Sequence, residues 1–147
     1  MPFIPLDEFA DKINEIMPMM MKEFARMQPQ EIYKGKVTFP QILILQQLIS
    51  RDSLRMTDIA DFMKVSTAAV TGIVDRMVKS GYVVRGFDQN DRRIIRIKAT
   101  FKGVALMKRL NNDRRRMVMD IFSKVSGQDR QDYLRVLMRI KSTISGG

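Results

Sequence analysis

One stretch of the sequence, residues 57–100, decides the fold: TDIADFMKVSTAAVTGIVDRMVKSGYVVRGFDQNDRRIIRIKAT. Near its middle, apolar residues recur at i, i+3, i+4 and i+7, the spacing of a helix with one face in a core: Val70, Ile73, Val74 and Met77. The opposite face of that helix carries mostly small or short side chains: Thr67, Ala68, Thr71, Gly72, Asp75 and Arg76. A helix with so little bulk on its outer face can lie close against another molecule.

A shorter helix is predicted just before this one. Thr57 is a good N-cap for it, and Ile59, Ala60 and Met63 would face inward. Residues 64–66 then form a turn, in which Ser66 caps the second helix. The spacing therefore predicts two helices joined by a short turn.

A hairpin is predicted after the second helix. Gly81 ends that helix, because glycine adopts the left-handed conformation at little cost. Strands follow at residues 82–87 and 94–98, and the loop between them ends in Arg92 and Arg93. A helix pair followed by an arginine-tipped hairpin is the arrangement by which a winged helix-turn-helix meets DNA.

Further helices flank this region. Residues 7–27 carry an approximately helical apolar stripe, which Pro18 should kink or restart. Thr38 and Gln41 have the spacing of a capping box and open the next helix. The same signals assign the other segments: a connector at 28–37, a break at 51–53, a helix at 100–124 capped by Thr100, a break at 126–127 and a helix at 129–144.

The predicted fold is mainly α with a small β-hairpin wing, an α+β winged helix-turn-helix. Residues 38–100 form the DNA-binding region, and residues 1–37 and 101–147 form dimerisation helices in one intertwined domain. The flanking helices would leave apolar faces bare on a lone module, so we expect two chains to pair through them as a homodimer.

The charge favours a polyanionic partner. The 147 residues carry a formal net charge of +10, and 45% of them are hydrophobic, an ordinary globular fraction. Residues 1–50 are slightly acidic, whereas residues 51–100 and 101–147 are both basic. The positive excess therefore begins where the outer helix face and the hairpin lie, which favours double-stranded DNA as the partner.

Composition also excludes several classes of function. Without cysteine or histidine, the chain has no thiol switch, no Ser-His or Cys-His catalysis and no usual zinc ligand set. We expect no metal, no cofactor and no enzyme activity. No apolar run approaches the roughly 20 residues of a membrane span, and the N-terminus lacks a basic signal-peptide start, so a cytoplasmic protein is expected.

The ordered set of motifs resembles the MarR family of bacterial and archaeal transcription regulators over nearly the whole chain. The segments that carry the resemblance are 37–41, 57–60, 65–77, 79–85, 88–93 and 99–103. The resemblance implies a dimer with intertwined terminal helices that presents two winged modules to successive major grooves. It also implies repression that a small ligand relieves, often an aromatic acid or a phenol. The absence of cysteine separates this chain from the thiol-based peroxide sensors of the family.

The outer helix face supplies the first candidate contacts to DNA: Ser66, Thr67, Ala68, Thr71, Gly72 and Arg76. Hydroxyls and free N–H groups at a helix N-terminus suit phosphates and base edges. Ser66 could instead act only as a cap. Gly72 either allows close approach of DNA or packs tightly against a neighbouring helix. Arg76 is the long donor left on this face.

The hairpin supplies the second set. A guanidinium at its tip would enter a narrow, A·T-rich minor groove. In the family pattern, one of Arg92 and Arg93 enters the groove while the other pairs with an acid that holds the wing. Asp75 is the favoured acid and Asp91 its rival. The sequence does not decide which arginine takes which role.

An alternative to a ligand-responsive repressor is a sequence-tolerant architectural DNA-binding protein without an effector, because the same charges would serve it. A repressor should prefer its own site by about 10³ or more over random duplex, whereas the architectural protein should not.

Overall fold

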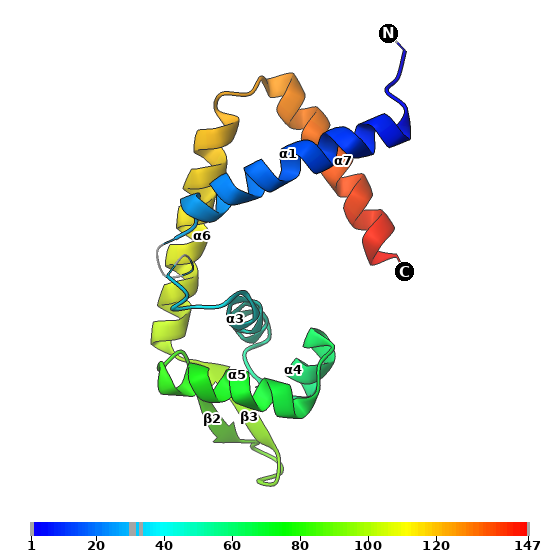
Figure 1. The fold of residues 1–147 in the computed structure, drawn as a ribbon. Coiled ribbons are helices and arrows are strands. Elements are labelled where there is room, and N and C mark those ends of the chain that lie inside the picture. Colours follow the sequence, from blue (N-terminus) through cyan, green and yellow to red (C-terminus); the bar gives the residue numbers. More distant parts are fainter. Residues whose placement is uncertain (1, 30–31, 33, 147) are drawn as a thin grey trace. The chain divides into compact units, whose positions relative to one another are not determined.

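The computed structural model describes residues 2–29, 32 and 34–146, and Figure 1 shows the order of their helices and strands. Residues 30, 31 and 33 of the predicted connector lie outside this description. Along the chain the elements are α1 (Leu6–Met27), α3 (Phe39–Arg51), β1 (Leu54–Arg55), α4 (Met56–Met63), α5 (Thr67–Lys79), β2 (Val83–Phe87), β3 (Ile95–Ala99), α6 (Phe101–Phe122) and α7 (Gly127–Ser145). They form two compact units, residues 1–111 and 112–147, whose boundary falls within α6. The predicted fold class, mainly α with a small wing, is confirmed.

The core of the first unit is built from the winged region and the first half of α6. The apolar stripe predicted for α5 is its centre, because Val70, Val74 and Met77 are fully buried and Ile73 packs beside them. Helix α3 contributes Ile42, Ile44, Leu45 and Leu48, and the sheet contributes Leu54, Val83 and Ile97. Leu106, Met107 and Leu110 of α6 close the cluster. This burial fixes the rotation of α5, and so decides which of its faces is exposed.

The wing is a three-stranded antiparallel sheet rather than the two-stranded hairpin that the sequence predicted. The strand order is β1-β3-β2, and Leu54 of β1 pairs with Ile97 of β3. The two predicted strands are present: β2 starts one residue later than predicted, and β3 starts and ends one residue later. Strand β1 has only two residues, too few for an alternating pattern, so only its pairing with β3 defines it.

Capping groups set where the helices begin. Thr38 and Gln41 form the predicted capping box at the start of α3. The prediction that Thr57 caps the next helix is wrong: α4 begins at Met56, and Thr57 lies inside it. The Asp58 carboxylate accepts the backbone N–H of Arg55 at 3.0 Å and two guanidinium N–H groups of the same residue. These bonds make Arg55 the N-cap, so the helix begins earlier in the chain than a Thr57 cap would place it.

The end of α5, the start of β2 and the start of α6 pack closely together. Gly81 adopts φ +82° after α5, as the sequence predicted. Thr100 donates its hydroxyl to the Gly81 carbonyl at 2.5 Å and accepts the Gly103 N–H at 3.1 Å, so it caps α6. A Cβ on Gly103 would lie 2.3 Å from the Tyr82 carbonyl oxygen. Only glycine lets α6 start this close to the sheet.

Helices α1 and α7 lie outside this core. Helix α1 runs without interruption through Pro18, so the proline does not start a new helix. Helix α7 begins at Gly127, two residues before the predicted start, because Ser126 accepts the Asp129 N–H at 3.1 Å. Neither helix has a buried residue among those that the structure describes. Their apolar side chains are therefore largely uncovered in a single chain.

Candidate nucleic-acid interface

The outer face of α5 is open to solvent, as its sequence predicted. Thr67, Ala68, Thr71 and Arg76 are exposed, and Gly72 is partly exposed. Because Val70, Val74 and Met77 fill the core, this face of α5 points away from the protein. The structure thus places the six candidate contacts of this helix on one surface or at the helix start that borders it.

The hydroxyl groups on this surface have defined partners. Ser66 accepts the Ala69 N–H at 3.1 Å, so it is a cap whose own O–H remains a donor. Thr71 donates its hydroxyl to the Thr67 carbonyl at 2.8 Å, which leaves the oxygen lone pairs as acceptors. Ser66 therefore suits a phosphate oxygen, whereas Thr71 suits an amino group on a base edge.

Gly72 does not pack against a neighbouring helix. A Cβ built there would meet only the Arg76 guanidinium, at 4.0 Å, among the atoms of the described residues. The packing alternative for Gly72 is therefore wrong. The absent side chain leaves an open patch over which the Arg76 side chain extends.

At the wing tip, the two arginines differ in their surroundings. Arg93 binds the Asp91 carboxylate through Nε at 3.1 Å and Nη2 at 3.0 Å, while its side chain remains 91% exposed. This charge-assisted pair lowers the pKa of Asp91 and raises the pKa of Arg93. Arg92 is exposed and makes no ion pair with any residue that the structure describes.

The prediction that Asp75 pairs with one of these arginines is wrong. The alternative acid, Asp91, forms the ion pair, and its partner is Arg93. Asp75 instead forms an ion pair with Arg85 on β2. Arg85 lies opposite Ile97 in the sheet, so the pair ties α5 to the wing strands. Asp75 thus supports the wing through its strand rather than through its tip.

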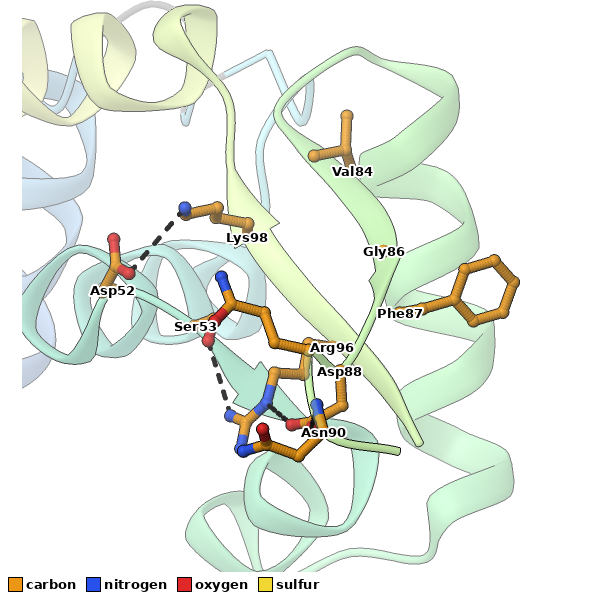
Figure 2. A pocket seen from close by; sticks show the side chains of 10 residues that line it. Asp52, Ser53, Val84, Gly86, Phe87, Asp88, Asn90, Arg96 and Lys98 are labelled. Carbon is orange, nitrogen blue, oxygen red and sulfur yellow. Dashed lines mark hydrogen bonds and ion pairs between the residues drawn. The ribbon is translucent and has the colours of Figure 1, made fainter. Parts of the chain in front are cut away.

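A second set of wing contacts went unnoticed in the sequence. Asp88 accepts the Arg96 guanidinium at 2.5 Å, and Arg96 also reaches the Ser53 hydroxyl at 3.4 Å. The bond from Arg96 is the main reason why the pKa of Asp88 is lowered. These residues line a hollow of about 420 Å³ on the outer face of the sheet, shown in Figure 2. The only signal in the sequence was the alternation of Arg96 and Lys98 with apolar residues, which marked them as outward-facing.

The described residues also bear on two other classes of site. No group of three or more carboxylates close enough to hold a metal ion occurs among them. None of their helices combines the length and apolar character needed to cross a bilayer.

Comparisons with known proteins agree with this geometry. Residues 37–95 match the model of the MarR family. The uncharacterized HTH-type transcriptional regulator YfiV of Bacillus subtilis is 36% identical over 70 residues, which cover 48% of this chain and 44% of YfiV. The HTH-type transcriptional repressor MdtR of the same organism is 31% identical over 98 residues, or 64% of this chain and 63% of MdtR. The matched segments thus span about half of YfiV and less than two thirds of MdtR.

A solved structure agrees in fold over almost the full length. A MarR family protein from Bacillus stearothermophilus superposes with a TM-score of 0.75 at 20% identity, covering 97% of this chain and 99% of that one. The family model covers the helix pair and most of the wing described above, and both relatives carry the names of HTH-type transcriptional regulators. Over the winged region, residues 37–95, the chain therefore matches the MarR family, and its fold is similar to that of a MarR family protein.

Proposed function

We propose that this protein is a sequence-specific DNA-binding transcriptional regulator that acts as a homodimeric repressor in the cytoplasm. The observation that carries the proposal is the outer face of α5, with short side chains and an open patch at Gly72, in the same compact unit as an arginine-tipped wing. Such a face lets the helix backbone approach base edges in a major groove. The wing arginines then meet the adjacent minor groove, where a narrow A·T-rich segment concentrates negative potential.

Two copies of the chain would pair through α1 and α7. Five apolar side chains of α1 are each between 39% and 48% exposed: Phe9, Ile13, Ile16, Met17 and Met20. Apolar side chains of α7 are exposed to a similar or greater extent: Tyr133, Leu134, Val136, Leu137, Met138, Ile140 and Ile144. Two helices that each bury no residue of their own need a partner surface. A second copy supplies self-complementary surface and the two-fold symmetry that a palindromic operator reflects.

The proposal is tested with the double variant Arg92→Ala plus Arg93→Ala in gel-shift assays. We expect loss of operator binding with an unchanged dimer mass, because the wing tip contributes nothing to α1 or α7. A matched control, Arg115→Ala plus Lys124→Ala, removes the same charge from exposed positions of the second unit. Full-strength binding by the wing variant would contradict the proposal.

The operator should be palindromic, with half-site centres roughly 34–36 Å apart, one helical turn. Binding should weaken with a log–log salt slope of about −0.9 for each phosphate neutralised. Equal affinity for selected and random duplexes would point instead to the architectural alternative.

Release from DNA would be noncovalent. The chain has no cysteine to oxidise and no histidine to bind zinc, so a small organic effector fits the composition. Selection of bound duplexes with and without aromatic acids or phenols tests this point. Duplex retention unaffected by every such compound would remove the effector from the proposal.

A further inference from the structure

Three side chains on the outer face of the wing sheet form a connected group that the DNA-contact surface does not include. They are Asp88, where the wing loop leaves β2, Arg96, the second residue of β3, and Ser53 in the turn between α3 and β1. Figure 2 shows the Arg96 guanidinium between the Asp88 carboxylate and the Ser53 hydroxyl. The group joins the wing loop to a distant part of the chain.

At the loop end, Asp88 uses both carboxylate oxygens. One accepts the backbone N–H of Asn90 at 2.9 Å and that of Asp91 at 3.2 Å, while the other accepts Arg96 Nε at 2.5 Å. The Asp88 side chain is only 12% exposed. The same carboxylate therefore sets the turn that precedes Arg92 and Arg93 and binds that turn to β3.

At the other end, Ser53 belongs to a fixed corner. Its N–H donates to the Arg51 carbonyl at 2.8 Å across Asp52, which has φ 68° and ψ −52°. These values are those of a γ-turn that is rare and strained for a residue with a side chain. The pairing of β1 with β3 and the 3.8 Å contact of Asp52 with Lys98 hold the corner in place. The corner at Ser53 is therefore held more rigidly than an ordinary surface loop.

We propose that Arg96 is a positioning residue for DNA recognition. It is a strut that holds the wing loop through Asp88 against the Ser53 corner, so that Arg92 and Arg93 are presented in a fixed geometry. In this role Arg96 acts through the loop and not by contacting DNA, and its Nε and one terminal nitrogen are engaged by protein acceptors. Without the strut the loop must be ordered during binding, and that loss of entropy weakens the complex. This inference rests on the proposed DNA-binding function.

The variant Asp88→Asn separates this role from simple electrostatics, because the two predict opposite signs. Removal of a carboxylate beside a polyanion should strengthen binding if charge alone matters. The strut predicts weaker binding, by roughly tenfold, because asparagine keeps the acceptor for the loop N–H groups but loses the charged bond to Arg96. Binding equal to or tighter than that of the native protein would overturn the proposal.

Two substitutions at position 96 complete the test. Arg96→Lys keeps the charge but not the forked geometry, and we expect it to weaken operator binding. Arg96→Met should weaken binding without changing the log–log salt slope, whereas a direct phosphate contact would reduce that slope by about 0.9. Lys108→Met removes one charge from an exposed position of α6 in the same compact unit, away from the strut, and serves as the control. A reduced slope for Arg96→Met alone would overturn the strut.

A measurement on the free protein distinguishes failure of the strut from failure of the proposed function. In Asp88→Asn the loop loses its charged bond to β3 and should open more often, although asparagine still accepts both N–H groups when the loop is closed. Hydrogen exchange at the Asn90 and Asp91 amides should therefore accelerate at least several-fold, while amides in the middle of α5 keep native rates. Unchanged exchange at the loop amides would overturn the strut whether or not the protein binds DNA. Failure of the native protein to bind any duplex would count against the proposed function alone.

Discussion

At the scale of single residues, Gly72 lowers the stability of α5 and is explained by function rather than by packing. Glycine inside a helix is less favourable than alanine by about 1 kcal/mol. The structure offers no packing reason for it, because a Cβ there would touch only the flexible end of Arg76. We attribute the glycine to the proposed approach of DNA to the backbone of α5.

We expect Gly72→Ala to raise the free energy of unfolding by about 0.5–1 kcal/mol and to weaken operator binding. Chemical unfolding and gel shifts measure the two effects. Gly103→Ala is the contrasting control, since its Cβ would lie 2.3 Å from the Tyr82 carbonyl oxygen and should destabilise the fold. A more stable Gly72→Ala protein with native affinity would remove Gly72 from the interface.

The ion pair between Arg93 and Asp91 leads to a second prediction at this scale. Arg93→Ala removes a guanidinium and also leaves the Asp91 carboxylate unpaired close to the phosphates, whereas Arg92→Ala removes only a charge. We therefore expect Arg93→Ala to weaken binding more than Arg92→Ala. The double variant Asp91→Ala plus Arg93→Ala should recover part of the loss. Titration of all three against one duplex at fixed salt checks this order, and no recovery in the double variant would contradict it.

At the scale of elements, side-chain caps decided boundaries that apolar periodicity left uncertain. The patterns at Thr38, Ser66 and Thr100 predicted their helix starts correctly, because each cap lies within three residues of the N–H group that it accepts. The sequence pattern places the start of α4 two residues too late, because the capping carboxylate is that of Asp58, three residues after Arg55. Strand β1 was missed because two residues carry no periodic signal.

The cap of α4 predicts a pH dependence. The Arg55 guanidinium lowers the pKa of Asp58, so its folded pKa lies below the unfolded value of about 4. The stabilisation is therefore fully present above that unfolded value and is lost as pH falls through the folded pKa. Asp58→Asn should lower the free energy of unfolding at pH 7 by roughly 0.5–1 kcal/mol and by less at pH 3.

Chemical unfolding at the two pH values measures this difference. Asp61→Asn, on the same helix, is the control, because the Asp61 carboxylate makes no side-chain hydrogen bond with the described residues. A deficit in Asp58→Asn that is the same at pH 7 and pH 3 would contradict the assignment.

At the scale of the whole molecule, the buried core and the uncovered helices have different roles. Among the residues that the structure describes, all sixteen buried apolar ones lie between Val37 and Leu110, so the winged module has its own core. Helices α1 and α7 add none to it, and in the proposed homodimer their apolar faces meet a second copy. DNA binding and pairing should therefore respond to different substitutions.

Leu137→Glu plus Ile140→Glu places two carboxylates on the apolar face of α7, where the native side chains are 42% and 48% exposed. We expect the mass in solution at micromolar concentration to fall from two subunits to one, because a buried unpaired charge is strongly unfavourable in an interface. Light scattering after size exclusion measures the mass, and circular dichroism checks that the winged module stays folded. Lys141→Glu is the charged control on the same helix, and an unchanged mass in the double variant would contradict pairing through α7.

The sequence by itself determined the apolar face of α5, the caps of α3, α5 and α6, the two longer strands and the identity of most candidate contacts. Each of these depends on residues a few positions apart, whose spacing a helix or strand turns directly into geometry. Only the tertiary structure decided that Asp75 binds Arg85, that Gly72 is open, and that Arg96 joins Asp88 to Ser53. Those contacts need the sheet register and the α3–β1 corner, which bring together residues 8 to 43 positions apart in the chain.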